Sequence, residues 1–280
     1  MNALEIRGLK KTFSGFQLGP LDLTLPGGCI LGLIGENGAG KSTTIKLILN
    51  MLRRESGTVT ILGRDNGQDL RSIKEEVGVV LDEVGLPDCL TSAQTGRVME
   101  GIFRQWDAAA YASYLRELGV PEGKAFKEMS RGNRMKLGIA VALSHHPRLL
   151  LLDEATSGLD PVVRDRVVEM LADFTRDEDH AVLLSSHIVS DLERICDYIA
   201  FLHKGKLLLC QEKDRLLEEY GFVHGAAGEL AAIDSAAVLH RSEGRYGAEA
   251  SVLRRAVPAG MEISPVTVEE LFMHMVKGER

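Results

Sequence analysis

One stretch of the chain combines residue types and spacing that suit the binding of a phosphate chain. Residues 35–43 read Gly-Glu-Asn-Gly-Ala-Gly-Lys-Ser-Thr and fit the pattern G-x-x-x-x-G-K-[ST]. Gly38 and Gly40 tolerate positive φ, so the chain can turn sharply there and direct backbone N–H groups at one anion. The Lys41 ammonium suits β- and γ-phosphates, and the Ser42 hydroxyl suits Mg²⁺. We therefore expect a nucleoside triphosphate at this loop. The residues expected to contact it are Asn37, Gly38, Gly40, Lys41, Ser42 and Thr43.

The segments around this loop predict an α/β fold. Residues 30–34 are a short apolar run typical of a strand buried on both faces, and residues 43–52 place apolar side chains at helical spacing. Because helical segments separate most of the apolar runs, the sheet should be mostly parallel, with the ligand at the carboxyl ends of its strands. The further strands expected in this part are residues 58–62, 77–81, 149–152, 181–184 and a hairpin over 198–210.

Three other regions depart from this alternation. Residues 4–25 have a β pattern interrupted by turns, which predicts N-terminal antiparallel strands. Residues from about 87 to 147 favour helices, at 91–104, 108–118 and 135–145, and predict a helical insertion. The domains expected are residues 1–210 and a small C-terminal extension over residues 211–280. The extension should end in a helix that begins at the capping box Thr267-Val268-Glu269-Glu270.

A pair of carboxylates suited to catalysis follows the apolar run at residues 149–152. At the end of that strand Asp153 can reach Mg²⁺ through water, and Glu154 can polarise a water molecule that attacks the γ-phosphate. Aliphatic strands that end in aspartate are common, so this pair does not identify the reaction by itself. Together with the phosphate loop, it suits the hydrolysis of ATP.

Composition and charge restrict the class of protein. The 280 residues carry a net charge of -7, which argues against a nucleic-acid-binding surface. No apolar run approaches the roughly 20 residues that cross a bilayer, and the N-terminus lacks the layout of a secretory signal. Four cysteines without C-x-x-C spacing are expected to be reduced thiols. We therefore expect a soluble, intracellular protein without a nucleic-acid partner.

The residues after Glu154 carry the strongest family signal. Residues 149–161 read Leu-Leu-Leu-Leu-Asp-Glu-Ala-Thr-Ser-Gly-Leu-Asp-Pro. With the phosphate loop they strongly resemble ATP-binding cassette (ABC) ATPases, and the resemblance covers residues 4–206. It implies the α/β fold of a P-loop NTPase, with a mostly parallel sheet core, an N-terminal antiparallel β portion and an α-helical insertion. An unrelated P-loop kinase does not account for the run from Asp153 to Asp160.

The resemblance also implies roles for individual residues. Phe13 matches the aromatic residue that stacks on adenine, although a core aromatic is an equally good interpretation of this position. Ser130 and Gly132 match the signature loop, which caps the γ-phosphate of ATP bound to the opposite subunit. Asp160 matches a loop that crosses between subunits. His187 matches a histidine that contacts the γ-phosphate, so the catalytic residues implied are this histidine and Glu154.

Two places depart from the family pattern. In the signature, Met129, Arg131 and Asn133 replace Leu, Gly and Gln, and Arg131 adds positive charge near the phosphate site. The family normally has a lid glutamine after the strand at 77–81, where it reaches Mg²⁺. This chain has Asp82 there, whose carboxylate has a shorter reach. The metal ligands implied are Ser42, Asp153 and Asp82, and the cofactors implied are ATP and Mg²⁺.

The resemblance implies a dimer and a membrane partner. The phosphate loop and signature loop of one chain cannot serve the same nucleotide, so two copies, or one copy and a paralogue, should pack head to tail around two ATP molecules. The family implies transport through a separately encoded permease, with export as the expected direction. A groove between the Asp82 lid and the helical insertion should receive a permease helix at the cytoplasmic face of the cell membrane. The alternative is a non-transport ABC ATPase of DNA repair or translation, although such chains usually carry two cassettes or a long coiled-coil insertion.

Overall fold

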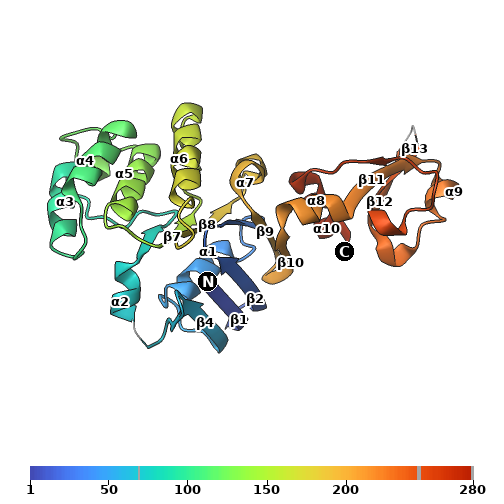
Figure 1. Ribbon diagram of the computed structural model, residues 1–280, viewed down its shortest axis with the longest axis horizontal. Coiled ribbons are helices and arrows are strands. Elements are labelled where there is room, and N and C mark those ends of the chain that lie inside the picture. The colour runs from blue at the N-terminus through green and yellow to red at the C-terminus, as the bar shows by residue number, and fades with distance from the viewer. Residues whose placement is uncertain (69, 245–246, 279–280) are drawn as a thin grey trace. The chain divides into compact units, whose positions relative to one another are not determined.

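The chain divides into two compact units, Met1–Leu207 and Leu208–Arg280 (Figure 1). The computed structural model describes residues 1–68, 70–244 and 247–278. None of the helices in these stretches combines the length and the hydrophobicity needed to span a bilayer. Each unit has its own sheet structure, so the two are described in turn.

The first unit is built around a largely parallel sheet. The strands of this sheet follow the order β10 (Lys206–Glu212), β9 (Tyr198–His203), β3 (Ile30–Ile34), β8 (Ala181–Ser186), β7 (Leu149–Asp153) and β6 (Val77–Val80). β10 begins in the first unit and continues past its end at Leu207. β3 pairs in parallel with β8 and β9, and β7 pairs in parallel with β8 and β6. β3, β7 and β8 are buried along their whole length, which explains their unbroken apolar sequences. The expected parallel core is confirmed.

The N-terminal strands form a separate antiparallel sheet in the same unit. Its order is β2 (Phe16–Pro26), β1 (Asn2–Phe13), β4 (Ser56–Ile61) and β5 (Arg64–Asp65). Alternate side chains of β1, including Leu4 and Ile6, are buried, as expected for strands with one covered face. The short strand β5 was not predicted, because two residues carry no periodic pattern.

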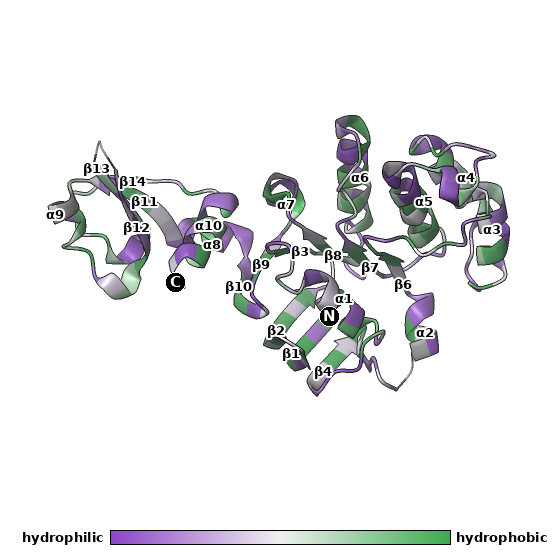
Figure 2. Cartoon of the chain, turned by 180° about the vertical axis from the view of Figure 1, so that it is seen from behind, coloured by the Kyte–Doolittle hydropathy of each residue, from purple (hydrophilic) through white to green (hydrophobic). Residues whose placement is uncertain are grey.

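The helical insertion lies between β6 and β7 in the sequence. Its helices α3 (Ser92–Glu100), α4 (Ala108–Glu117) and α5 (Arg131–Leu143) lie side by side, and each carries both polar and apolar residues (Figures 1 and 2). α5 begins at Arg131, earlier than the helix predicted over 135–145, because Ser130 caps its N-terminus. The other helices of this unit are α1 (Lys41–Ile48), α2 (Leu70–Glu75), α6 (Pro161–Phe174), α7 (Val189–Ile195) and a short 3-10 helix at Phe126–Glu128.

The second unit contains an antiparallel sheet that the sequence did not predict. Its strand order is β12 (Val238–Gly244), β13 (Gly247–Leu253), β11 (Tyr220–Gly225) and β14 (Ile263–Ser264). Val223, Ala250 and Val252 join Leu230 and Ile233 in a hydrophobic core on one face of this sheet. The helical elements are α8 (Lys213–Glu219), α9 (Ala227–Leu230), α10 (Val268–Gly278) and 3-10 helices at Ser235–Ala237 and Arg254–Ala256.

The C-terminal helix α10 begins where the sequence predicted. The Thr267 hydroxyl accepts a hydrogen bond from the Glu270 backbone N–H at 3.2 Å, and the Glu270 carboxylate accepts one from the Thr267 backbone N–H at 2.9 Å. These reciprocal bonds satisfy two backbone donors at the helix start. The predicted capping box is confirmed.

The contact between His274 of α10 and His240 of β12 predicts a pH dependence of the second unit. His274 Nδ1 lies 2.5 Å from the Ser251 hydroxyl, and its ring lies 5.1 Å from those of Phe222 and His240. Burial lowers the pKa of His274, and the nearby His240 and Lys277 lower it further. The folded unit therefore binds a proton less readily than the unfolded chain does, and stability should fall as pH drops below about 6.5.

Urea unfolding of the second unit, followed between pH 7.5 and pH 5.5, measures this dependence. Replacing His274 with asparagine should flatten the pH profile. Replacing the exposed His224 in the same way should leave it steep. Equal slopes in wild type and His274→Asn would contradict the assignment.

Candidate functional site

The phosphate loop joins the buried strand β3 to the N-terminus of α1. Gly38 and Gly40 have φ of 82° and 113°, so the positive φ expected of both glycines is observed. A Cβ on Gly40 would lie 2.6 Å from the Leu18 side chain, whereas a Cβ on Gly38 would meet no atom within 4 Å. Gly40 is thus packed closely against its neighbours, whereas the space beside Gly38 is open. The first N–H groups of α1 have no intrahelical acceptors, so this helix end suits an anion.

Lys41, Glu154 and His187 meet at the carboxyl edge of the central sheet. Lys41 Nζ lies 3.2 Å from Glu154 Oε1, and His187 Nδ1 lies 2.6 Å from Glu154 Oε2. Because an ionised carboxylate only accepts, His187 donates from Nδ1 to this oxygen. Three segments that are distant in the sequence meet here because β3, β8 and β7 are adjacent and parallel. The Lys41 and Glu154 side chains are 5% and 11% exposed, so their interaction is weakly screened by water.

Ser185 holds the carboxylate of Asp153 and the backbone of Glu154, and it was not singled out from the sequence. Its hydroxyl donates to Asp153 Oδ1 at 2.6 Å, and its backbone carbonyl accepts from the Glu154 N–H at 3.0 Å. Glu154 has a φ of 53°, a conformation that is strained for a residue with a side chain and that is common at functional sites. The contact between Ser185 and Asp153 follows from the strand register, because these two residues pair across β7 and β8. Sequence alone does not give that register.

The signature residues lie at the N-terminus of α5. The exposed Ser130 caps the helix, and its hydroxyl accepts from the Asn133 N–H at 3.2 Å. A Cβ on Gly132 would lie 2.8 Å from the Gly158 carbonyl oxygen, so glycine permits this close approach. Ser130 and Gly132 therefore share one helix end. The structure does not bring them into the Lys41–Glu154–His187 cluster by any contact among the described residues.

Asp160 caps helix α6. Its carboxylate accepts from the Val163 N–H at 3.1 Å and lies 3.6 Å from Lys136 Nζ. The backbone hydrogen bond from Val163 lowers the pKa of Asp160, and the positive charge of Lys136 lowers it further. The contact with Lys136, which lies on α5, was not foreseen from the sequence.

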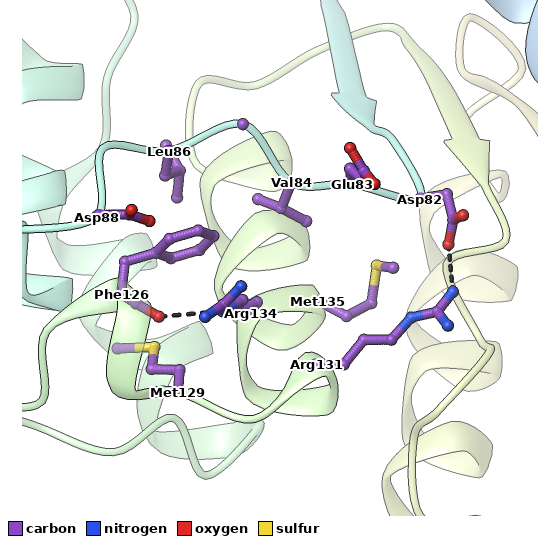
Figure 3. A pocket seen from close by; sticks show the side chains of 11 residues that line it. Asp82, Glu83, Val84, Leu86, Asp88, Phe126, Met129, Arg131, Arg134 and Met135 are labelled. Atoms are coloured by element: carbon purple, nitrogen blue, oxygen red, sulfur yellow. Dashed lines mark hydrogen bonds and ion pairs between the residues drawn. The ribbon is translucent and has the colours of Figure 1, made fainter.

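Phe13 and Asp82 complete the residues expected at the site. The Phe13 side chain is 38% exposed, which rules out the interpretation as a core aromatic. Its ring lies 6.3 Å from that of Phe16, and Phe16 in turn lies beside Gly40 of the phosphate loop. Asp82 forms an ion pair with Arg131 of the signature loop (Figure 3). Two of the positions where the chain departs from the family pattern, Asp82 and Arg131, are therefore in contact.

These residues fit a magnesium–nucleotide complex. The glycine-rich turn, the α1 N-terminus and the buried Lys41 ammonium provide donors for phosphate oxygens. The buried carboxylate of Asp153 and the hydroxyl of Ser42 are oxygen ligands of the kind that Mg²⁺ prefers. Magnesium usually takes one or two protein ligands together with substrate phosphates, so a larger carboxylate cage is not required.

Comparison with known proteins agrees with this geometry. A family described as "ABC transporter" matches residues 18–157. "ABC transporter ATP-binding protein YtrB" of Bacillus subtilis is 29% identical over 99% of this chain and 99% of its own length. "Lantibiotic transport ATP-binding protein SrtF" of Streptococcus pyogenes is 33% identical over 75% of this chain and 91% of its own length. The similarity to YtrB thus extends through the second unit.

A solved structure supports the fold. The protein described as "Structure of ATP binding subunit of ABC transporter" superposes with a TM-score of 0.70 at 26% identity, covering 76% of this chain and 91% of that chain. The expected α/β fold of a P-loop NTPase is confirmed. The chain belongs to the ABC transporter family and is an ATP-binding, ATP-hydrolysing subunit of a transporter.

Proposed function

We propose that this chain powers the export of a solute through a permease that is a separate polypeptide. The observation that carries the proposal is the contact of Lys41 and His187 with the two oxygens of Glu154, because it joins a phosphate-binding group to a general base. The match to YtrB over 99% of both chains supports a transporter role for the whole chain. Export and a position on the cytoplasmic face of the cell membrane are parts of the proposal.

Within the proposal, each group has one task. The phosphate loop and Lys41 hold the phosphates, and Phe13 offers a ring face to adenine. Ser42 and Asp153 would hold Mg²⁺, which neutralises charge on the phosphates. Glu154 accepts a proton from the attacking water, and His187, held by Glu154, contacts the γ-phosphate. Asn37, Gly38, Gly40 and Thr43 complete the phosphate contacts.

The active form in this proposal is a head-to-tail dimer of two copies or of one copy and a paralogue. Ser130 is exposed at the N-terminus of a long helix, and the Asp160 side chain is 56% exposed. Both are thus accessible to a second subunit. Ser130, Gly132 and Asp160 would then complete the phosphate site of the opposite copy.

Two hollows at the edge of the insertion are candidates for contact with a permease. The lid hollow has a volume of about 680 Å³ and is lined partly by Asp82, Glu83, Arg131 and Arg134 (Figure 3). The second, the apolar hollow, has a volume of about 670 Å³. It is lined mainly by aliphatic and aromatic side chains, including Leu49, Met51, Val77, Val79, Ile102 and Phe103.

The apolar hollow is the better match to a helix of the permease. Met51 and Ile102 are 57% and 58% exposed, and an amphipathic helix buries its apolar face in such a groove. Arg71, Lys74 and Glu75 supply charged groups around it. We therefore place the permease helix at the apolar hollow, rather than at the lid hollow expected from the sequence.

Replacing Ile102 with glutamate should release the chain from its permease. A buried carboxylate opposite an apolar helix is costly, so co-purification with permease-containing membranes should fall at least about ten-fold, while ATP binding persists. Met273→Glu is the matched control, because Met273 is 44% exposed on α10 and is not among the residues that line either hollow. Membrane association of wild type that does not require the permease would contradict transport and favour a non-transport ABC ATPase.

A further inference from the structure

The ion pair between Asp82 and Arg131 connects two functional segments of one subunit. Asp82 follows β6, and Arg131 is the first residue of α5; the two are 49 residues apart in the sequence. Figure 3 shows the guanidinium facing the carboxylate at one end of the lid hollow. The pair therefore links the lid to the signature loop directly.

The sequence changes at these two positions are complementary. The family pattern has a neutral glutamine at the position of Asp82 and a glycine at that of Arg131. This chain has a negative and a positive side chain instead, and they meet.

The pair lies between the catalytic sheet edge and the helix end expected to face a second subunit. Val80 pairs with Leu152, so Asp82 follows β6 at the edge where Asp153 and Glu154 follow Leu152. Arg131 directly follows Ser130, the exposed cap of α5. A guanidinium at this helix N-terminus adds its charge to that of the free N–H groups.

The ion pair is weak enough for Arg131 to exchange the Asp82 carboxylate for another anion. Its side chains are 44% and 60% exposed, and exposed ion pairs are weak because water screens them. Arginine can bind either a carboxylate or a phosphate through two charge-assisted hydrogen bonds. Here Arg131 contacts Asp82 through Nη2 and Oδ1, so a phosphate that is held in place and engages two guanidinium nitrogens makes the stronger contact. A bound terminal phosphate can therefore displace Asp82 from Arg131.

We propose that Arg131 binds the terminal phosphate of ATP held by the phosphate loop of a second copy, and that Asp82 is the residue that positions Arg131 in the separate subunit. The inference rests on the head-to-tail dimer proposed above. It gives Asp82 a role as counter-ion of Arg131. When the dimer closes, the guanidinium of Arg131 releases the Asp82 carboxylate and binds the terminal phosphate instead.

The test measures ATP-dependent dimerisation in a Glu154→Gln background. This substitution slows hydrolysis, so the equilibrium between monomer and dimer can be measured while ATP stays bound. Arg131→Ala should weaken the dimer at least about ten-fold in ATP, and Arg131→Lys should recover part of the loss. Asp82→Asn should strengthen the dimer about two- to five-fold, because the competing carboxylate is gone. In the Arg131→Ala background, Asp82→Asn should strengthen it no further. Glu83→Gln, which removes the neighbouring carboxylate, is the control and should leave the affinity unchanged.

Three outcomes overturn the inference, and the first is distinguishable from the other two. If the Glu154→Gln parent fails to dimerise in ATP, the proposed dimer is wrong and the inference falls with it. If the parent dimerises but Arg131→Ala has the same affinity, or Asp82→Asn has the same effect with and without Arg131, the inference alone is wrong.

Discussion

Replacing Glu154 with glutamine is expected to lower the rate of ATP hydrolysis by about two to four orders of magnitude, the usual effect of removing a general base. Glutamine keeps the volume of the side chain and an oxygen acceptor for Lys41, which lies 3.2 Å from Glu154 Oε1. It cannot take a proton from water at neutral pH. ATP binding should therefore remain close to that of wild type while phosphate release nearly stops.

Phosphate release and binding of a fluorescent ATP analogue measure the two effects separately. Glu122→Gln makes the same chemical change at an exposed position of the insertion and should leave both unchanged. Hydrolysis by Glu154→Gln at the wild-type rate would show that another group accepts the proton.

Replacing Lys41 with methionine is expected to weaken ATP binding by about ten- to a hundred-fold, because a charge-assisted hydrogen bond to phosphate is lost. Lys41 is 5% exposed, and its Nζ donates to the Gly35 carbonyl at 2.7 Å. Methionine has a similar length, so the packing of the stem is retained. The ammonium that contacts both the loop and Glu154 is removed.

Calorimetric titration with ATP gives the affinity, and thermal unfolding without nucleotide checks the fold. Lys46→Met, on the same helix, is the control and should bind ATP like wild type. Unchanged affinity in Lys41→Met would contradict the assignment of the phosphate site. A lower affinity that accompanies loss of the folded state would require the comparison to be repeated at a lower temperature.

The parts of the fold that sequence predicted are those with strong local signals. β3, β7 and β8 are continuous apolar runs because both faces of each strand are covered. α6 spans Pro161–Phe174, because proline suits its first turn and Asp160 caps it. The phosphate loop was predicted because its glycines must adopt positive φ.

The sheet of the second unit was not predicted, for a physical reason. In β13 the buried side chains include Ala248 and Ala250, whose small apolar surface gives little contrast with the exposed positions. Its partner β11 lies far away in the sequence, and the register depends on that distant pairing. The capping box before α10 gave the clearest local signal in this part of the chain.

Contacts between residues that are far apart in the sequence could not be predicted either. The Asp82–Arg131 ion pair and the Ser185–Asp153 hydrogen bond depend on which segments become neighbours in space. Family resemblance indicated the individual positions of Asp82 and Asp153. It could not indicate that departures at Asp82 and Arg131 would compensate each other's charge.

The central claim is that the phosphate loop of one copy works with the signature loop of another, and complementation in trans tests it most directly. Lys41→Met disables the phosphate loop. Ser130→Asp keeps a good cap for α5, because aspartate is a favoured N-cap residue, but places a negative charge against the γ-phosphate. Each variant alone should hydrolyse ATP poorly. Mixing them should restore hydrolysis to about a quarter of the wild-type rate, since half of the dimers are mixed and each then has one intact site. Two folded variants that remain inactive when mixed would contradict the claim.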